Sequence, residues 1–376
     1  MSFKKRFLAL SAAALLLLGM SVPAGASSEE EEPAAPKRGV TINVYNWGEY
    51  ISNGVEGTLD VNAEFTRRTG IDVNYTTFDT NESLYSKLAG GGANYDVIIP
   101  SDYMVSKLIE EGYLEKLDFD NIPNFQYISD RFKNPSYDPE NLYSVPYTWG
   151  TLGIIYNSAM VEEPITSWDA MFDPQYADQV LMINNSRDAL GIALMDLNYS
   201  VNTDSEEELR AAYDLLAQAK EAGVYQAFVM DEVFDKMETG EAAISAYYAG
   251  DYLTMLETNP DLKYVVPEEG SNWFVDAMCV LKTSQHKEEA EAWINFMAST
   301  EANLRNMDYI WYASPNAEAL ETYPAYYEET YGEPLDPALY EIMAPSQEVL
   351  DRCEAYLVLP AETRTLYNDL WTQLGI

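Results

Sequence analysis

The sequence is poor in the residues that most catalytic and metal sites need. Its 376 residues include one histidine, His286, and two cysteines. His286 lies in the polar segment 284–287, where nothing suggests that it lies beside a nucleophile, so a serine or cysteine hydrolase triad is not indicated. The histidine and cysteine content is also too low for a zinc site of that type. We therefore expect no catalytic residue, no metal and no cofactor, and we interpret His286 as a surface residue.

Motifs that bind phosphate groups are also missing. The sequence has no P-loop and no Gly-x-Gly-x-x-Gly motif after a predicted strand. The glycine run at residues 90–92 precedes a predicted strand, so we interpret it as a turn. Nucleotide-dependent functions are not indicated.

Basic residues are scarce. The chain has 22 lysines and arginines against 62 aspartates and glutamates, which gives a net charge of −40. This excess argues against nucleic acid and anionic membranes as partners, and it would attract cations. The simplest explanation is that the charge keeps an exported protein soluble.

The N-terminus lacks a stretch long enough for a comfortable membrane span. A basic start is followed by an apolar run at 7–18 and a small-residue cleavage site, which together predict a signal peptide at residues 1–26. Residues 27–36 read as a disordered acidic leader. No cysteine near the cleavage site could carry a lipid. We expect an exported, periplasmic or otherwise extracytoplasmic protein.

The two cysteines, Cys279 and Cys353, leave the question of a disulfide open. An exported protein could form one. Cys279, however, lies within the apolar run 277–281, which favours a buried free thiol.

What the chain does have is a regular alternation of strands and helices. Such alternation predicts mainly parallel sheets covered by helices, and about 340 ordered residues predict two domains. The expected strands lie at 40–45, 71–78, 95–100, 180–183, 242–248 and 274–281. The expected helices lie at 59–69, 81–88, 103–111, 190–197, 206–222, 231–238, 286–298 and 362–374, with Gly70 as a C-cap and Ser101 or Asp102 as an N-cap.

Aromatic and acidic residues gather where predicted strands end. Trp47, Glu49 and Tyr50 follow the first strand, Ser101 and Tyr103 follow the third, and Tyr248 follows a later one. Ligands of open α/β sheets bind at these carboxyl ends. Aromatic faces attract organic cations, and carboxylates hold ammonium groups. Acids and rings without local bases predict a site for a small, multiply charged amine.

Asp276 fits the same interpretation. It lies in an apolar strand with no base within seven residues on its N-terminal side, and it shares a strand face with Phe274 and Met278. A buried carboxylate without a partner is costly, so it needs a cation. A buried acid that bonds to backbone groups or to a distant arginine remains an alternative.

The residues resemble those of the spermidine/putrescine-binding proteins, the extracytoplasmic receptors of polyamine ABC transporters, from about Val40 to the C-terminus. The motifs that carry the resemblance are Tyr45-Asn46-Trp47-x-Glu49-Tyr50, Tyr95-Asp96-Val97-x-x-Pro100-Ser101-x-Tyr103, Ser144-Val145-Pro146-Tyr147-x-Trp149-Gly150, Ser167-Trp168 and Tyr312-x-x-Pro315-Asn316.

The resemblance implies a two-lobed α/β fold like that of periplasmic binding proteins. Each lobe would be a mixed, mostly parallel sheet flanked by helices, with the ligand cleft at the hinge. It further implies one lobe at 37–148 plus 275–315 and another at 149–274 plus 316–376. The implied partners are a linear polyamine and the permease subunits of an ABC transporter, and a monomer is expected.

The resemblance also implies the ligand-binding residues. Trp47, Glu49, Tyr50, Ser101, Tyr103, Asp276 and Tyr312 match the family pattern, and Tyr248 stands where a tryptophan is common. Three positions depart from the pattern. Asn185 replaces a first acid, although Asp188 keeps the second; Phe274 stands where a tryptophan is usual, beside Trp273; and a family glutamine aligns loosely with Tyr356. The loss of an acid at 185 leaves the choice between putrescine and spermidine open.

Other functions remain possible on the sequence alone. A receptor of the same fold could bind a sugar or another neutral solute, since rings also stack on sugars. Paired carboxylates could serve an extracellular glycoside hydrolase, although 62 acids make any single pair uninformative. An amine sensor that contacts a signalling protein is a further alternative. We expect a receptor and not an enzyme.

Overall fold

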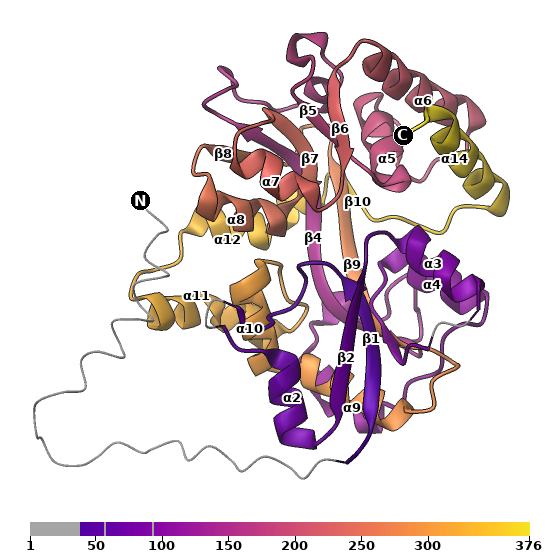
Figure 1. The fold of residues 1–376 in the computed structure, drawn as a ribbon, viewed down its shortest axis with the longest axis vertical. Helices are drawn as coiled ribbons and strands as arrows, with labels where there is room; N and C mark the ends of the chain where they lie inside the picture. The colour runs from indigo at the N-terminus through magenta and orange to yellow at the C-terminus, as the bar shows by residue number, and fades with distance from the viewer. Residues whose placement is uncertain (1–37, 56–57, 92–93) are drawn as a thin grey trace, which may run out of the picture.

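The computed structural model describes residues 38–55, 58–91 and 94–376 (Figure 1). The expected signal peptide at 1–26, the acidic leader at 27–36 and Gly92 of the expected turn lie outside these residues. Across the described ranges, no helix combines the length and the apolar character needed to span a membrane.

The first lobe, at the lower end of Figure 1, is built on parallel strands. In sheet order these are β2 (Asp72–Phe78), β1 (Thr41–Trp47) and β3 (Val97–Ile98), after which β9 (Ser271–Val280) runs antiparallel to β3. The helices of this end of the molecule are α2 (Val61–Thr69), α3 (Asn81–Ala89), α4 (Asp102–Glu110), α9 (Lys287–Met297), α10 (Thr300–Ile310) and α11 (Ala317–Tyr331).

The second lobe repeats this arrangement. Strands β7 (Ile244–Tyr248), β5 (Val180–Ile183) and β6 (Tyr225–Val229) are parallel to one another. The antiparallel strand β8 (Leu262–Val265) pairs with β4 (Ser144–Asn157), and the short β10 (Cys353–Glu354) pairs with β9. The helices here are α5 (Ser186–Asp196), α6 (Glu206–Glu221), α7 (Glu232–Glu238), α8 (Ala249–Thr258), α12 (Pro337–Met343), α13 (Gln347–Leu350) and α14 (Ala361–Leu374).

Strand β4 connects the two lobes. Its first part, from Ser144 to Thr151, pairs with β9, and its second part, from Leu152 onward, pairs with β7 and β8. Figure 1 shows β4 and β9 passing between the lobes. The predicted two-lobed α/β fold with mixed sheets is therefore confirmed, whereas the exact boundaries of the lobes stay a prediction.

Helix caps explain where the observed elements depart from the expected ones. Gly70 ends α2 with a φ of 73°, as expected, and Asp60 begins this helix by accepting a hydrogen bond from the Ala63 amide. The helix expected at 190–197 instead begins at Ser186, because the side chain of Asn185 accepts bonds from the amides of the first turn. The expected cap by Ser101 or Asp102 is wrong in part: Ser101 holds the N-cap position, but its side chain does not cap the helix.

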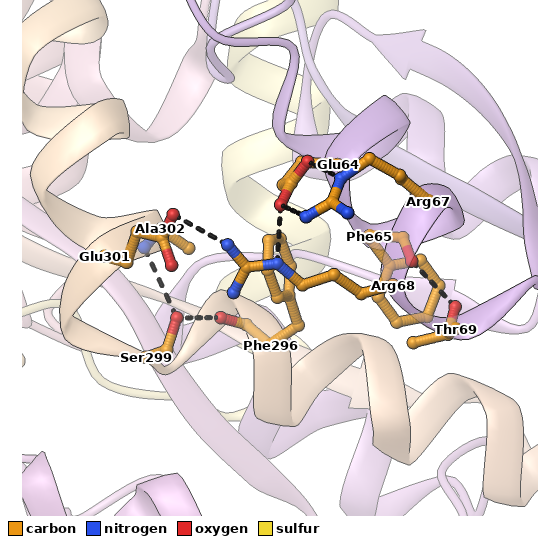
Figure 2. Close-up of polar contacts among 9 residues, drawn as sticks. All are labelled: Glu64, Phe65, Arg67, Arg68, Thr69, Phe296, Ser299, Glu301 and Ala302. Carbon is orange, nitrogen blue, oxygen red and sulfur yellow. Dashed lines mark hydrogen bonds and ion pairs between the residues drawn. The ribbon is translucent and has the colours of Figure 1, made fainter. Parts of the chain in front are cut away.

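Ion pairs fix the outer surface of the first lobe (Figure 2). Glu64 accepts bonds from Arg67 and Arg68 of its own helix, at 2.7 and 2.6 Å. Arg68 also pairs with Glu301 of α10 at 2.8 Å, and its guanidinium lies 5.6 Å from the centre of the Phe296 ring. These contacts join α2 to α10, and they place bases beside acids.

The two cysteines are not joined. Cys279 is fully buried and Cys353 is half-buried, and both are free thiols. The expectation of a buried free thiol at Cys279 is confirmed. His286 is partly exposed at the N-cap position of α9.

Candidate ligand-binding cavity

A narrow cavity of about 70 Å³ lies between the lobes, at the carboxyl ends of β1 and β7 and beside β9. The structure brings all eleven predicted site residues to its wall, although their chain positions span more than 260 residues. They are Trp47, Glu49, Tyr50, Ser101, Tyr103, Asn185, Asp188, Tyr248, Phe274, Asp276 and Tyr312. That they bind a ligand stays a prediction.

Aromatic rings form much of the wall. Tyr312 meets Tyr50 edge to face, with ring centres 4.9 Å apart, and Phe274 meets Tyr248 edge to face at 5.3 Å. The Tyr312 ring lies directly on Gly250, where an added Cβ would come within 2.3 Å of ring carbons. These contacts hold the rings in fixed orientations around the cavity.

Asp276 lies on the cavity floor, with 3% of its surface exposed. The Tyr50 hydroxyl donates a 2.6 Å hydrogen bond to its Oδ2 atom. Its Oδ1 atom is buried and has no hydrogen-bond partner among the described residues. Burial raises the pKa of Asp276 to about 6, since the charged form loses its hydration.

Asp188 is held in the same way. The hydroxyls of Tyr248 and Tyr356 donate to its two oxygens, at 2.7 and 2.9 Å. Burial raises the pKa of this carboxyl to about 6 as well. Tyr356 stands where the family pattern has a glutamine, so the structure gives this departure a role: its hydroxyl orients a cavity acid.

The polar residues of the predicted set are also tied to the scaffold. The Asn185 Oδ1 accepts the Arg187 amide at 2.9 Å, so this atom caps α5. The Ser101 Oγ accepts from the Asn81 side chain at 3.0 Å, and the Tyr103 hydroxyl donates to Glu82 at 3.1 Å.

Three further acids line the cavity that the sequence reasoning did not name: Asp79, Asp231 and Asp251. Asp251 accepts a 2.9 Å bond from the Tyr312 hydroxyl, and burial raises its pKa to about 8. Asp79 and Asp231 are exposed, as is Glu49. All three missed acids follow a strand end, after β2, β6 and β7, so the rule that identified Trp47 could have identified them too.

One base departs from the expected pattern of acids and rings alone. Arg187 lines the cavity, and its Nη2 atom donates to Asn202 at 3.0 Å and to the Leu357 carbonyl at 3.2 Å. Among the described residues, no lysine or arginine forms an ion pair with any of the six cavity carboxylates. No base of the described chain therefore neutralises these six carboxylates through an ion pair.

The chain matches known proteins over most of its length. The family model for bacterial extracellular solute-binding proteins matches residues 61–330. The chain belongs to this family. A spermidine/putrescine-binding periplasmic protein of Salmonella typhimurium is 33% identical over 313 residues, which cover 82% of this chain and 84% of that protein. A putrescine-binding periplasmic protein of Pseudomonas aeruginosa is 30% identical and covers 89% of this chain and 91% of its own length.

A solved structure agrees with this assignment. The substrate-binding protein of a spermidine/putrescine ABC transporter from Streptococcus pneumoniae superposes with a TM-score of 0.72. It is 36% identical in sequence and covers 89% of this chain and 98% of that one. The resemblance drawn from the sequence motifs is thus confirmed, and the cavity of this solute-binding protein lies between its lobes, where the resemblance placed the ligand.

The described part of the chain contains no group of three or more His, Cys, Asp or Glu side chains placed to hold a metal ion. Three of the six cavity carboxylates, Asp188, Asp251 and Asp276, accept hydrogen bonds from tyrosine hydroxyls. This arrangement suits an organic cation, which can use rings and carboxylates together.

Proposed function

We propose that this protein is an extracytoplasmic receptor that binds a linear polyamine and delivers it to an ABC-type permease. The observation that carries the proposal is that neutral tyrosine hydroxyls, and not bases, hold the buried acids of the cavity. Asp188, Asp251 and Asp276 each accept hydrogen bonds from tyrosine hydroxyls, and none forms an ion pair with a base of the described residues. Capture requires no bond to be broken.

Tyrosine hydroxyls suit this task because they are neutral donors. An arginine would orient a carboxylate and also cancel its charge, whereas a hydroxyl orients it and leaves the charge available. The raised pKa values of Asp188 and Asp276 show that burial opposes the charged form in the free protein. An ammonium group in contact with these oxygens removes that penalty.

The rings supply the remaining affinity. Trp47, Tyr248, Phe274 and Tyr312 can pack the methylene groups of an extended chain and face its cations. Each charge-assisted bond contributes roughly 1.5–3 kcal/mol net. Cation–π contacts add about 0.5–2 kcal/mol each. Two anchors with such contacts support a free energy of about −8 kcal/mol, or micromolar affinity.

The extra acids bear on which polyamine binds. The loss of an acid at Asn185 removes one partner for an amine, but Asp79, Asp231 and Asp251 add carboxylates elsewhere in the cavity. The number of acids therefore supports a triamine such as spermidine as well as the diamine putrescine. The printed names of the relatives include both ligands.

Delivery would follow closure of the lobes about β4 and β9. Both strands cross between the lobes, so bending there changes the width of the cleft. We propose that a monomer with bound polyamine presents both lobes to the permease subunits.

Titration calorimetry tests the function directly. Putrescine and spermidine are titrated into the purified protein, with maltose and glucose as neutral controls and a lysine-rich peptide as a control for non-specific attraction to the acidic surface. We expect saturable, micromolar or tighter binding of at least one polyamine and none of the controls. Binding of a sugar with no polyamine binding, or release of sugar from a glycan, would replace this proposal by the neutral-solute receptor or the hydrolase.

A further inference from the structure

A second compartment adjoins the amine cavity. It is a groove of about 840 Å³ between α3 and α4 of the first lobe and α14 with the segment 357–359 of the second. Figure 1 shows α14 above α3 and α4 on the same side of the molecule. The groove shares Tyr103, Asn185 and Arg187 with the amine cavity, so these three residues lie between the two compartments.

The groove has the opposite charge to the cavity. It is lined by three bases, Lys107, Arg187 and Arg364, and by two acids, Glu82 and Glu111. None of the three bases forms an ion pair with an acid of the described chain. The chain has almost three acids for each base, so unpaired bases that gather in one place need a physical reason.

Arg187 gives the clearest sign of a missing partner. Only 6% of its surface is exposed, yet its Nε and Nη1 atoms have no hydrogen-bond partner among the described residues. Its guanidinium lies 4.6 Å from the ring centre of Tyr356 and 5.2 Å from that of Tyr367. Rings attract a cation but do not accept strong hydrogen bonds, so two buried donors are left over.

Lys107 and Arg364 face the groove from opposite lobes. The Lys107 Nζ lies 3.2 Å from the centre of the Tyr85 ring. Burial lowers the pKa of Lys107 and the nearby Arg364 adds to this, although Glu111 and Glu82 act in the opposite direction. The Arg364 Nη1 donates to the Leu359 carbonyl at 2.7 Å. A negative group between them would relieve the repulsion and would link α4 to α14.

We propose that this groove binds a carboxylate group, bridging the two lobes beside the bound amine. Three bases and two acids leave one net positive charge, which suits a monovalent carboxylate better than a divalent phosphate. A carboxylate also matches the planar fork of a guanidinium. The group has two sources: a free anion bound with the amine, or an acidic substituent carried by the polyamine itself. The inference rests on the proposed amine-binding function.

Calorimetry with two probes separates these sources. The first probe is N-(2-carboxyethyl)spermidine, which keeps every ammonium charge of spermidine and adds one carboxylate. The second is acetate, exchanged for chloride at constant ionic strength while unmodified spermidine is titrated. The variants are Lys107→Gln and Arg364→Gln. The matched control is Lys263→Gln, which removes the same charge from an exposed residue of β8 outside the groove.

If the polyamine itself carries the carboxylate, N-(2-carboxyethyl)spermidine should bind at least tenfold more tightly than spermidine. If the groove binds a free anion, spermidine should bind at least threefold more tightly in acetate than in chloride. Either gain should fall to less than twofold in Lys107→Gln and Arg364→Gln and persist in Lys263→Gln. The absence of both gains in a protein that binds spermidine, or a gain that survives in the groove variants, overturns the carboxylate site alone. Failure of every amine to bind overturns the proposed function instead.

Discussion

Glu64 on the surface and Asp276 in the cavity carry the same chemical group in opposite settings. Hydrogen bonds from Arg67, with Arg68 beside it, lower the pKa of Glu64 to about 2. Burial raises the pKa of Asp276 to about 6. The surface acid has its counter-charges within the chain (Figure 2), whereas the cavity acid accepts a hydrogen bond from the Tyr50 hydroxyl and forms no ion pair with a base of the described chain.

The difference separates stability from binding. A paired surface acid helps the folded chain a little, since solvent screens most of its energy. An unpaired buried acid opposes folding and favours an external cation. Changing each residue in turn should therefore shift stability in opposite directions and affect binding in only one case.

Asp276→Asn should have the largest effect. The substitution keeps the shape of the side chain but removes the charge that holds an ammonium, so spermidine affinity should fall at least thirtyfold, which corresponds to about 2 kcal/mol or more. Calorimetry measures this loss. Asp235→Asn, an exposed residue of α7, removes the same charge outside the cavity and should leave the affinity unchanged. Unchanged affinity in Asp276→Asn would remove this residue from the site.

Acidification should weaken amine binding nearly as much. With folded pKa values of about 6, Asp188 and Asp276 are ionised at pH 7.5 and largely protonated at pH 5 in the free protein. Roughly one molecule in ten is then ionised at each site, so affinity should fall at least tenfold. Titrations at the two pH values with matched buffer ionisation measure the effect. An affinity that does not depend on pH would contradict the role of these acids.

Asp188→Asn should stabilise the ligand-free protein. A carboxyl whose folded pKa is raised above its ordinary value stabilises the fold below pH 4 and loses that contribution as pH rises through 6. At pH 7.5 the substitution should therefore raise the free energy of unfolding by about 1–2 kcal/mol and Tm by a few degrees. The gain should vanish at pH 4. Thermal unfolding monitored by circular dichroism at both pH values checks the sign.

Glu64→Gln should have the smallest effect. Loss of the pairs with Arg67 and Arg68 should lower the free energy of unfolding by about 0.5 kcal/mol, because the two arginine side chains are 33% and 38% exposed and solvent screens such pairs. The loss should shrink in high salt. It should be complete above the ordinary glutamate pKa of 4.5 and should disappear as pH falls through about 2, the pKa of Glu64 in the fold. Urea unfolding measures it. A change in amine affinity in Glu64→Gln would contradict the view that surface acids affect stability alone and cavity acids affect binding.

Much of this fold could be predicted from local sequence signals. The apolar stretch at 180–183 became β5, and the capping glycine at Gly70 ended α2, because these features act over a few residues. The ends of the strands depended on pairing with distant parts of the chain. The strand expected at 95–100 pairs over only Val97 and Ile98. The short strands β6, β8 and β10 were not expected, since pairing with distant strands defines them.

The site divides in the same way. The resemblance and the strand-end rule gathered eleven residues that do line one cavity. The partners of those residues could not be foreseen, because Tyr356 reaches Asp188 across 168 residues of chain and Tyr50 reaches Asp276 across 226. Arg187 was not among the predicted site residues. The groove that adjoins the cavity could not be predicted either, because it is formed by α14, which packs there through tertiary contacts.

The contact between Gly250 and the Tyr312 ring limits how this receptor could diverge. Any side chain at position 250 would push the ring into the space meant for the solute, and it would pull the hydroxyl away from Asp251. Variants that bind bulkier molecules must therefore carry a smaller side chain at position 312 or at neighbouring positions of the cavity wall. A search for altered solute preference, in nature or in the laboratory, should find position 250 unchanged.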